Sequence, residues 1–395
     1  MARLGDVFPL IRNGASIKQT DGAEGLPITR IETIANREID RSRMGYADVT
    51  DLAKYADYQL QDGDILMSHI NSEKHLGKVA RYKAIDGEYI IHGMNLLMLR
   101  ADKSLITPGY AECFFNSDMF LRQIPNITKK SVNQASFNVS ALKELQIPIP
   151  TLTTQHEIEM RFEKVDSLIS LRKQQIAKLD ELVKARFVEM FGDPVQNTQK
   201  WEQALLHEVT SKIGSGATPK GGKESYQDNG ITLIRSMNVH DGRFEYKELA
   251  HITDEQAAQL ANVTVEENDV FINITGASVA RSCLVPSEVL PARVNQHVAI
   301  IRCIRNRLNP VFANRMFLNE SFKGQLLDIG ESSGATRQAI TKQQLEMLTI
   351  ILPPLDLQHQ FAAFVAQTDQ QKLTIQHSLA KLELLKKALM QTYFG

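Results

Sequence analysis

The last 51 residues of the chain repeat an earlier stretch of the same chain. Residues 142–192 align with residues 345–395 at a constant offset of 203, with 16 identities in 51 positions. The segment LKELQIPIPTLTTQH corresponds to LEMLTIILPPLDLQH, and IAKLDELVKARFVEMFG corresponds to LAKLELLKKALMQTYFG. Repetition on this scale indicates that the chain forms one structural unit twice, so its fold must contain two similar halves.

The correspondence continues to the front of each half. Five residues near the amino terminus lie 202 residues before matching ones: Leu4, Val7, Ile11, Gly14 and Ala15 match Leu206, Val209, Ile213, Gly216 and Ala217. Between these anchors the match is looser, through Arg30 and Arg235, Asp64 and Asp269, and Arg100 and Arg302. Short apolar runs bounded by Gly, Asn and Asp predict strands. Each half therefore starts with a strand-rich domain, at 1–150 and 194–353, and the differing loops are typical of domains that recognise different targets.

A long helical pattern follows each domain, at 151–193 and 354–395. Thr154 with Glu157 is predicted to cap the first helix and Asp356 the second, and Gly192 followed by Pro194 ends the first. Apolar residues recur at spacings of three and four, which is typical of a seam against another helix. They are Ile158, Phe162, Val165, Ile169, Ile176, Leu179 and Val183 in the first, and Phe361, Val365, Ile375, Leu379, Leu382 and Leu389 in the second.

These helices are too long to be covered by one domain. At about 35 residues, each would extend for about 50 Å. The sequence therefore predicts an α+β chain with two similar strand-rich domains separated by two long helices. The helices form an antiparallel coiled coil, and the chain has a pseudo-twofold internal repeat. The alternative is that each helix packs only on its own domain.

Length and composition limit the class of protein. At 395 residues the chain exceeds one ordinary core, and 43% hydrophobic with 23% charged residues is typical of a globular protein. The start, MARLGDVFPLIRNG, lacks the apolar stretch of a signal peptide, and no run approaches the roughly 20 apolar residues of a membrane span, so a cytoplasmic location is expected. Cys113, Cys283 and Cys303 are widely separated, and the ten histidines show no ligand spacing, so neither a disulfide framework nor a metal site is predicted.

One glycine-rich segment, KIGSGATPKGGKES at 212–225, resembles a phosphate-binding loop. That motif needs a Gly, four residues, then Gly-Lys and a Ser or Thr whose hydroxyl holds magnesium. Here Glu224 follows Gly222-Lys223, Ala217 stands where the first Gly is required, and Pro219 removes a backbone donor. The matching segment of the first half, IRNGASIKQT, has no Lys-Ser pair. The glycines are therefore predicted to serve a shared backbone path rather than a nucleotide.

Two further motifs connect the repeat to a known family. The segment ARFVEMFGDPVQNTQKWEQALLHEV joins the end of the first helical pattern to the start of the second domain. The element P-x-L-x-x-Q occurs at Pro150, Leu152 and Gln155 and again at Pro353, Leu355 and Gln358. With these motifs the chain resembles, over essentially its full length, the specificity subunit of type I restriction-modification systems. The family often has Glu before that Gln, whereas this chain has Thr154 and Leu357, which puts in doubt any contact that a carboxylate makes there.

The resemblance implies two target recognition domains, each reading one half of a split sequence in double-stranded DNA, with the spacer set by the helices. It also implies two methyltransferase subunits, which carry S-adenosylmethionine, and restriction subunits in the full complex, which use ATP and magnesium. The chain itself is then expected to hold no cofactor and to catalyse nothing.

Two other functions remain as alternatives. A self-contained DNA adenine methyltransferase is suggested by NPVF, at Asn309 to Phe312. It differs by one residue from the Asn-Pro-Pro-Tyr/Phe motif, which holds the amino group of a target base. The matching TPGY, at Thr107 to Tyr110, lacks the asparagine, and both stretches fit a proline in a first helical turn. A purely structural coiled-coil spacer would explain the helices but would leave two domains without a role.

Candidate DNA contacts lie on loops rich in Arg, Lys, Asn, Gln, Ser and Thr, the residue types that bind bases and phosphates. For each residue alone, an ordinary solvated side chain is an equal alternative. In the second domain the candidates are Thr218, Lys220 and Lys223, then Thr275, Ser278 and Arg281, then Ser333, Thr336, Arg337 and Gln338. In the first domain they are Ser16 and Lys18, then His69, Asn71, Lys74 and Lys78, then Lys129, Lys130, Asn133 and Gln134.

Overall fold

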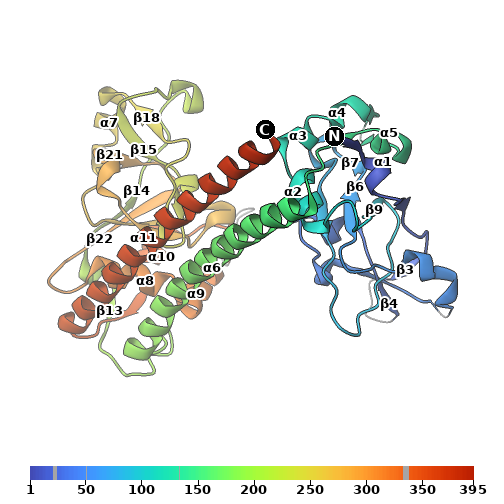
Figure 1. Cartoon of the computed structure of the whole chain (residues 1–395). Coiled ribbons are helices and arrows are strands. Elements are labelled where there is room, and N and C mark those ends of the chain that lie inside the picture. The colour runs from blue at the N-terminus through green and yellow to red at the C-terminus, as the bar shows by residue number, and fades with distance from the viewer. Residues whose placement is uncertain (21–24, 50, 133, 332–337) are drawn as a thin grey trace. The chain divides into compact units, whose positions relative to one another are not determined.

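The computed structural model describes residues 1–20, 25–49, 51–132, 134–331 and 338–395. These residues form two compact units, which are labelled in Figure 1 by their helices and strands. Unit 1 contains Met1–Lys173 and His377–Gly395, and unit 2 contains Gln174–Gln376. Each unit therefore combines one strand-rich domain with a part of each long helix.

Unit 1 is built around a four-stranded antiparallel sheet in the order β2-β9-β6-β8. The described residues of this unit also form three smaller sheets and five short α-helices. The strands of the main sheet are β2 (Leu10–Asn13), β9 (Leu96–Arg100), β6 (Ile65–Ser68) and β8 (Val79–Arg81). The smaller sheets are β3 (Gln19–Thr20), β5 (Gly45–Ala47) and β4 (Leu26–Ile28); β10 (Lys129–Lys130), β11 (Ala135–Ser136) and β7 (Ile70–Asn71); and β1 (Ala2–Arg3) with β12 (Gln146–Ile147). The helices are α1 (Leu4–Val7), α2 (Pro108–Phe115), α3 (Asp118–Leu121), α4 (Ile124–Ile127) and α5 (Val139–Lys143).

Unit 2 repeats the central sheet in the order β14-β22-β19-β20. Its strands are β14 (Thr210–Ser215), β22 (Val298–Cys303), β19 (Val270–Asn273) and β20 (Ser282–Leu284). The smaller sheets are β18 (Ala250–Ile252), β15 (Ile231–Ile234) and β21 (Ala292–Val294); β16 (Val239–His240) and β17 (Arg243–Phe244); and β13 (Gln203–Leu205) with β23 (Thr349–Ile351). The helices are α7 (Asp254–Gln259), α8 (Pro310–Phe317), α9 (Glu320–Glu331) and α10 (Lys342–Glu346).

A buried ion pair recurs in both sheets. Arg100 binds Asp64 through two contacts of 2.8 and 2.7 Å, and Arg302 binds Asp269 through two contacts of 2.8 Å. Both aspartates are buried. The matched Asp and Arg residues of the two sequences are therefore structural, because a buried carboxylate without its cation would cost about 3–5 kcal/mol.

The repeated glutamine of the P-x-L-x-x-Q element ties each long helix to its own domain. The buried Gln155 side chain accepts from the Thr107 backbone N–H at 2.8 Å and donates to the carbonyls of Leu105 and Pro150. In unit 2 Gln358 makes the same three bonds, to the N–H of Asn309 and to the carbonyls of Arg307 and Pro353. An amide supplies one acceptor and two donor hydrogens, so it satisfies all three buried backbone groups.

The long helices are α6 (Leu152–Phe191) and α11 (Leu355–Phe394), and neither contains Gly or Pro. The predicted caps were wrong by a few residues. The carbonyl of Thr151 already accepts from the Gln155 N–H at 2.9 Å, so α6 begins before Thr154. The carbonyl of Pro354 likewise accepts from Gln358 at 3.2 Å, which places Asp356 within the first turn of α11, where a carboxylate is stabilised by the helix dipole.

The two helices contact each other in both units. In unit 1 Lys386 binds Asp166 at 2.5 Å, and Phe162 packs against Phe394. In unit 2 Lys372 binds Asp180 at 2.5 Å. Going forward along α6 from Asp166 to Asp180 means going back along α11 from Lys386 to Lys372, so the helices are antiparallel, as predicted. The alternative, in which each helix packs only on its own domain, is wrong.

No helix among the described residues combines the length and the apolar character that a membrane crossing requires.

Candidate nucleic-acid interface

The sheet order brings the predicted loops together at one end of each central sheet. In unit 2, Ser215 at the end of β14 pairs with Ala299, and Asn273 at the end of β19 pairs with Val298. The loops that leave these two strands therefore lie beside the turn that enters β22. In unit 1 the pairs Asn13 with Leu97 and Ser68 with Leu96 produce the same arrangement. We call these regions loop end 1 (residues 14–18, 69–78 and 92–95) and loop end 2 (residues 216–220, 274–281 and 295–297).

The repeated glycine at each loop end has a packing reason. A Cβ on Gly14 would lie 2.0 Å from the Gly93 carbonyl oxygen, and one on Gly216 would lie 1.8 Å from the Val294 carbonyl oxygen. Either distance is a severe clash with backbone, so only glycine fits. These two glycines permit a close approach of two backbone segments, which explains Gly216 in the 212–225 segment without a nucleotide.

Two residues that the sequence analysis missed connect the loops of loop end 2. Thr218 donates to the Gln296 side chain at 2.5 Å, and Gln296 contacts His297 at 3.2 Å. The other ring nitrogen of His297 lies 2.5 Å from the Thr275 hydroxyl. Thr218 and Thr275, from different loops, are therefore joined through the turn before β22. Gln296 and His297 could have been noticed as the polar residues that replace Met94 and Asn95 of the first half.

The third loop of unit 2 lies beside the second. The N–H of Gly276 donates to the Gln338 carbonyl at 2.9 Å, and Ile340 donates to Ile274 at 2.8 Å. The Gln338 side chain donates to Glu331 at 2.7 Å. Ser333, Thr336 and Arg337 lie outside the described residues.

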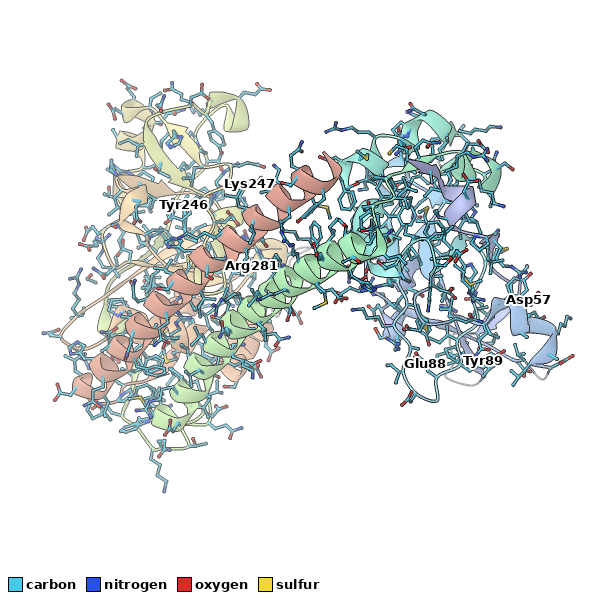
Figure 2. All side chains as sticks on the ribbon, in the orientation of Figure 1. Asp57, Glu88, Tyr89, Tyr246, Lys247 and Arg281 are labelled. Carbon is cyan, nitrogen blue, oxygen red and sulfur yellow. The ribbon has the colours of Figure 1, made fainter. Side chains whose placement is uncertain are left out.

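The other candidates of unit 2 differ in exposure. Lys220 is exposed, and Ser278 is half-buried at the end of a short 3-10 helix, Gly276–Ser278. Arg281, labelled in Figure 2, is also half-buried, and its guanidinium has no ion pair or hydrogen bond to a described residue. The side chain of Lys223 lies outside the part of the chain that the structure describes. Loop end 2 therefore carries exposed hydroxyl and amide groups, from Thr218 and Gln296, together with the exposed Lys220 and the half-buried Arg281.

In unit 1 a three-stranded sheet joins two candidate groups that are far apart in sequence. Ala135 of β11 pairs with Asn71 of β7 on one side and with Lys130 of β10 on the other. Lys74 and Lys129 are exposed, and Lys130 binds Glu73 at 2.9 Å. Gln134 is exposed, as are Ser16 and Lys18 at the start of loop end 1, whereas Asn133 lies outside the described ranges. The β10–β11 hairpin thus extends loop end 1.

Two candidates in unit 1 are less available than the sequence suggests. His69 is buried and packs edge-on against Phe137, and burial lowers the pKa of its imidazole to about 4. The Lys78 ammonium donates to the Ala35 carbonyl at 2.9 Å, and burial lowers its pKa. His69 therefore packs in the core beneath its loop, and the Lys78 ammonium is held by a hydrogen bond within the domain.

The asparagine that suggested a methyltransferase motif has a structural role. The Asn309 side chain accepts from the N–H groups of Val311 at 2.9 Å and Phe312 at 3.3 Å, so it caps α8. Thr107 caps α2 in the same way by accepting from Tyr110 at 3.2 Å. Both stretches are helix starts with proline in the first turn, as the repeat predicted.

The chain therefore contains two similar domains, each with polar loops at one end of its central sheet, and two antiparallel helices that pair with each other. The model of the type I restriction modification DNA specificity domain family matches residues 1–181 and again residues 198–384. The chain belongs to this family.

Individual relatives agree with this assignment. The chain is 30% identical, over 98% of its own length and 90% of the relative, to a putative type I restriction enzyme MjaX specificity subunit of Methanocaldococcus jannaschii. It is 24% identical over 48% of its length to the EcoKI specificity subunit of Escherichia coli, of which 41% is covered. Among solved structures, the S subunit of a type I restriction-modification system from M. genitalium aligns over 100% of this chain and 95% of its own, with a TM-score of 0.59 and 13% identity.

Family membership confirms the resemblance stated from the sequence. The chain is a DNA specificity subunit, a recognition component rather than a catalyst, and nothing in the comparisons favours a methyltransferase.

Proposed function

We propose that residues 1–150 and 194–353 are two target recognition domains, each of which reads one half of a split sequence in double-stranded DNA. The observation that carries this proposal is that the same sheet end occurs twice with different side chains. Thr218, Gln296 and His297 form a polar network at loop end 2, whereas Met94 and Asn95 stand at the matching turn of loop end 1. One backbone with two side-chain sets suits two different half-sites.

The exposed cations and polar groups of the two loop ends make the DNA contacts in this proposal. Lysine and arginine bind phosphates and position the protein, while amide, hydroxyl and guanidinium groups read base edges. Lys74, Lys129 and Gln134 serve in unit 1, and Lys220 and Arg281 serve in unit 2.

The helices at 151–193 and 354–395 set the spacer in this proposal and dock two methyltransferase subunits. Large apolar side chains are exposed on both helices. Leu182 on α6 and its repeat equivalent Leu385 on α11 are 48% and 46% exposed. They belong to different units, so each unit offers an equivalent exposed leucine on its helix pair. The methyltransferase subunits would supply S-adenosylmethionine, restriction subunits would supply the ATP- and magnesium-dependent steps, and the complex would act in the cytoplasm.

The experiment that tests the proposal is methylation mapping of DNA from cells that express the chain with its partner subunits. A split target with two half-sites and a fixed spacer is expected. Exchange of loop end 2 alone should change one half-site and preserve the other. A continuous target, or a simultaneous change of both half-sites, would refute the proposal.

A biochemical test concerns the partners. The purified chain alone should show no heat of S-adenosylmethionine binding in titration calorimetry, and the assembled complex should contain two methyltransferase subunits per chain by light scattering. A one-to-one complex at saturation would contradict the docking of two subunits.

A further inference from the structure

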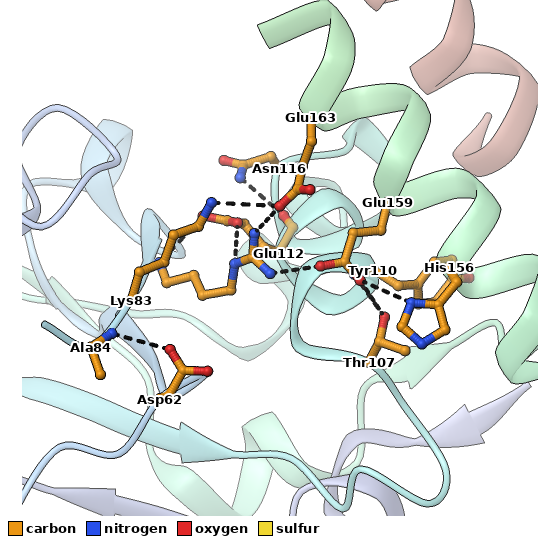
Figure 3. Close-up of polar contacts among 11 residues, drawn as sticks. Asp62, Lys83, Ala84, Thr107, Tyr110, Glu112, Asn116, His156, Glu159 and Glu163 are labelled. Carbon is orange, nitrogen blue, oxygen red and sulfur yellow. Dashed lines mark hydrogen bonds and ion pairs between the residues drawn. The ribbon is translucent and has the colours of Figure 1, made fainter. Parts of the chain in front are cut away.

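A group of charged residues joins the base of loop end 1 to helix α6. Arg81 is the last residue of β8, the edge strand that directly follows the 69–78 segment. Its guanidinium binds Glu112 at 2.9 Å, Glu159 at 2.7 Å and Glu163 at 2.7 Å. Figure 3 shows these three glutamates and Lys83, which binds Glu163 at 3.5 Å. We call Arg81 and the three glutamates the charged junction.

The charged junction is partly enclosed. The side chains of Arg81 and Glu159 are only 11% and 13% exposed. Glu112 also accepts from the Arg81 backbone N–H at 3.3 Å, and Glu159 accepts from the Thr107 hydroxyl at 2.9 Å. Gly109 leaves space for the Glu159 side chain, because a Cβ at position 109 would lie 1.8 Å from the Glu159 carboxylate. Glu159 and Glu163 accept hydrogen bonds from two different guanidinium nitrogens of Arg81, and charge-assisted bonds of this kind add geometric specificity.

Unit 2 lacks this junction. Arg81 pairs with Ile65 in β6, and in the matching register Leu284 pairs with Val270 in β19. Ala362 and Ala366 occupy the repeat positions of Glu159 and Glu163. Asn314 stands at the repeat position of Glu112 and donates to the Ser282 hydroxyl of β20 at 2.9 Å. Among the described residues, no cluster of carboxylates on one arginine occurs at this place in unit 2, so the two loop ends are attached to their helices by different physical means.

From this difference we infer that Arg81 is a positioning residue for recognition of the first half-site. It holds the strand that ends the 69–78 segment in one orientation on α6, the helix proposed to set the spacer. The inference rests on the proposed function, since it assumes that loop end 1 reads DNA. It assigns no DNA contact to Arg81 itself.

The test compares discrimination at the two half-sites in the assembled methyltransferase complex. Equilibrium competition measures affinity for the mapped target, for a target with one changed base pair in the first half-site, and for one changed in the second. Arg81→Gln should reduce discrimination at the first half-site by about fivefold, the scale expected for a coupling residue without ligand contact, and leave the second unchanged. The ratio of affinities is independent of the active fraction, so partial unfolding alone would not produce this result.

Two further variants make the test decisive. Lys83→Gln removes a cation from the edge of the same group, where Lys83 is 70% exposed, and should leave both ratios at the parent value. The charge-reversed pair Arg81→Glu with Glu159→Arg should restore part of the first-site discrimination.

The inference would be overturned if the Arg81→Gln complex had the same affinity ratios as the parent complex at both half-sites. If that variant does not assemble, Glu163→Gln decides instead. It removes the most exposed carboxylate of the charged junction, and parent ratios there would equally overturn the inference. Failure of the proposed function would look different, because the parent complex itself would then show no separable half-sites.

Discussion

The spacer proposal can be tested by lengthening the coiled coil, and the structure specifies how. Asp166–Lys386 and Asp180–Lys372 fix the same antiparallel register in the two units. The boundary between the units falls between these pairs, at Lys173 in α6 and Gln376 in α11. An insertion in α6 alone would displace one ion pair from its partner by the inserted length. A matched insertion of four residues after Gln175 and four after Gln376 preserves both.

The expected shift follows from helix geometry. Four residues add about 6 Å at 1.5 Å each and advance the helix by about 400°, a net rotation of about 40°. Two base pairs add about 7 Å and rotate the duplex by about 70°. Seven residues would add about 10 Å with a net rotation of about −20°. The matching three base pairs would rotate the DNA by about 100°. The helix rotation and the DNA rotation differ by about 30° for four residues but by about 120° for seven, so the four-residue insertion is the better test.

The assay is methylation mapping of the four-residue double insertion beside the parent and beside the single insertion. The double insertion should prefer a spacer that is longer by one or two base pairs, with both half-sites unchanged. The complex that contains the single-insertion variant should methylate DNA weakly at every spacer length, because one of the two ion pairs is displaced. An unchanged spacer in an active double-insertion variant would refute the proposal that the helices set the spacer, and would leave them with a role in assembly only.

Three further outcomes are expected. Replacing four loop cations by Ala should weaken DNA binding and reduce the slope of log affinity against log salt, as happens when phosphate contacts are lost; unchanged affinity and slope would show that another surface binds DNA. The cations are Lys220, Lys223, Arg281 and Arg337. Gln358→Ala should lower the free energy of unfolding by about 2–4 kcal/mol in urea titration, because three buried backbone groups lose their partner, and Gln155→Ala should do the same; a loss below the error of the titration would contradict the assigned bonds. Burial lowers the pKa of His92 from 6.5 to about 3, so the unfolded chain binds the extra proton below pH 6.5. His92 should therefore contribute up to about 1.4 kcal/mol per pH unit to the fall of the free energy of unfolding between pH 6 and 4, and His92→Gln should make that fall shallower.

The architecture could be predicted from the sequence because its signals are local and occur twice. The apolar spacing in both long helices requires a partner stripe, and the two copies supply one for each other. The repeated Gly14 and Gly216 indicated a common backbone path, and the structure shows why no side chain fits there. The repeat also predicted that NPVF and TPGY are both helix starts with proline in the first turn, and the structure adds that Asn309 and Thr107 cap these helices.

Only the tertiary structure decided which of the predicted loop residues are exposed and free to contact DNA. His69 carries a side chain suited to base reading, yet it packs against Phe137 inside the domain. Lys78 has a backbone carbonyl as its partner, and Gln296 and His297 join two loops more than fifty residues apart in sequence. Arg81 meets carboxylates from two helices that follow it by roughly 30 to 80 residues. The sequence by itself therefore determined the two domains and the paired helices, whereas exposure and long-range partners depend on strand order and packing, which bring together residues that no local pattern connects.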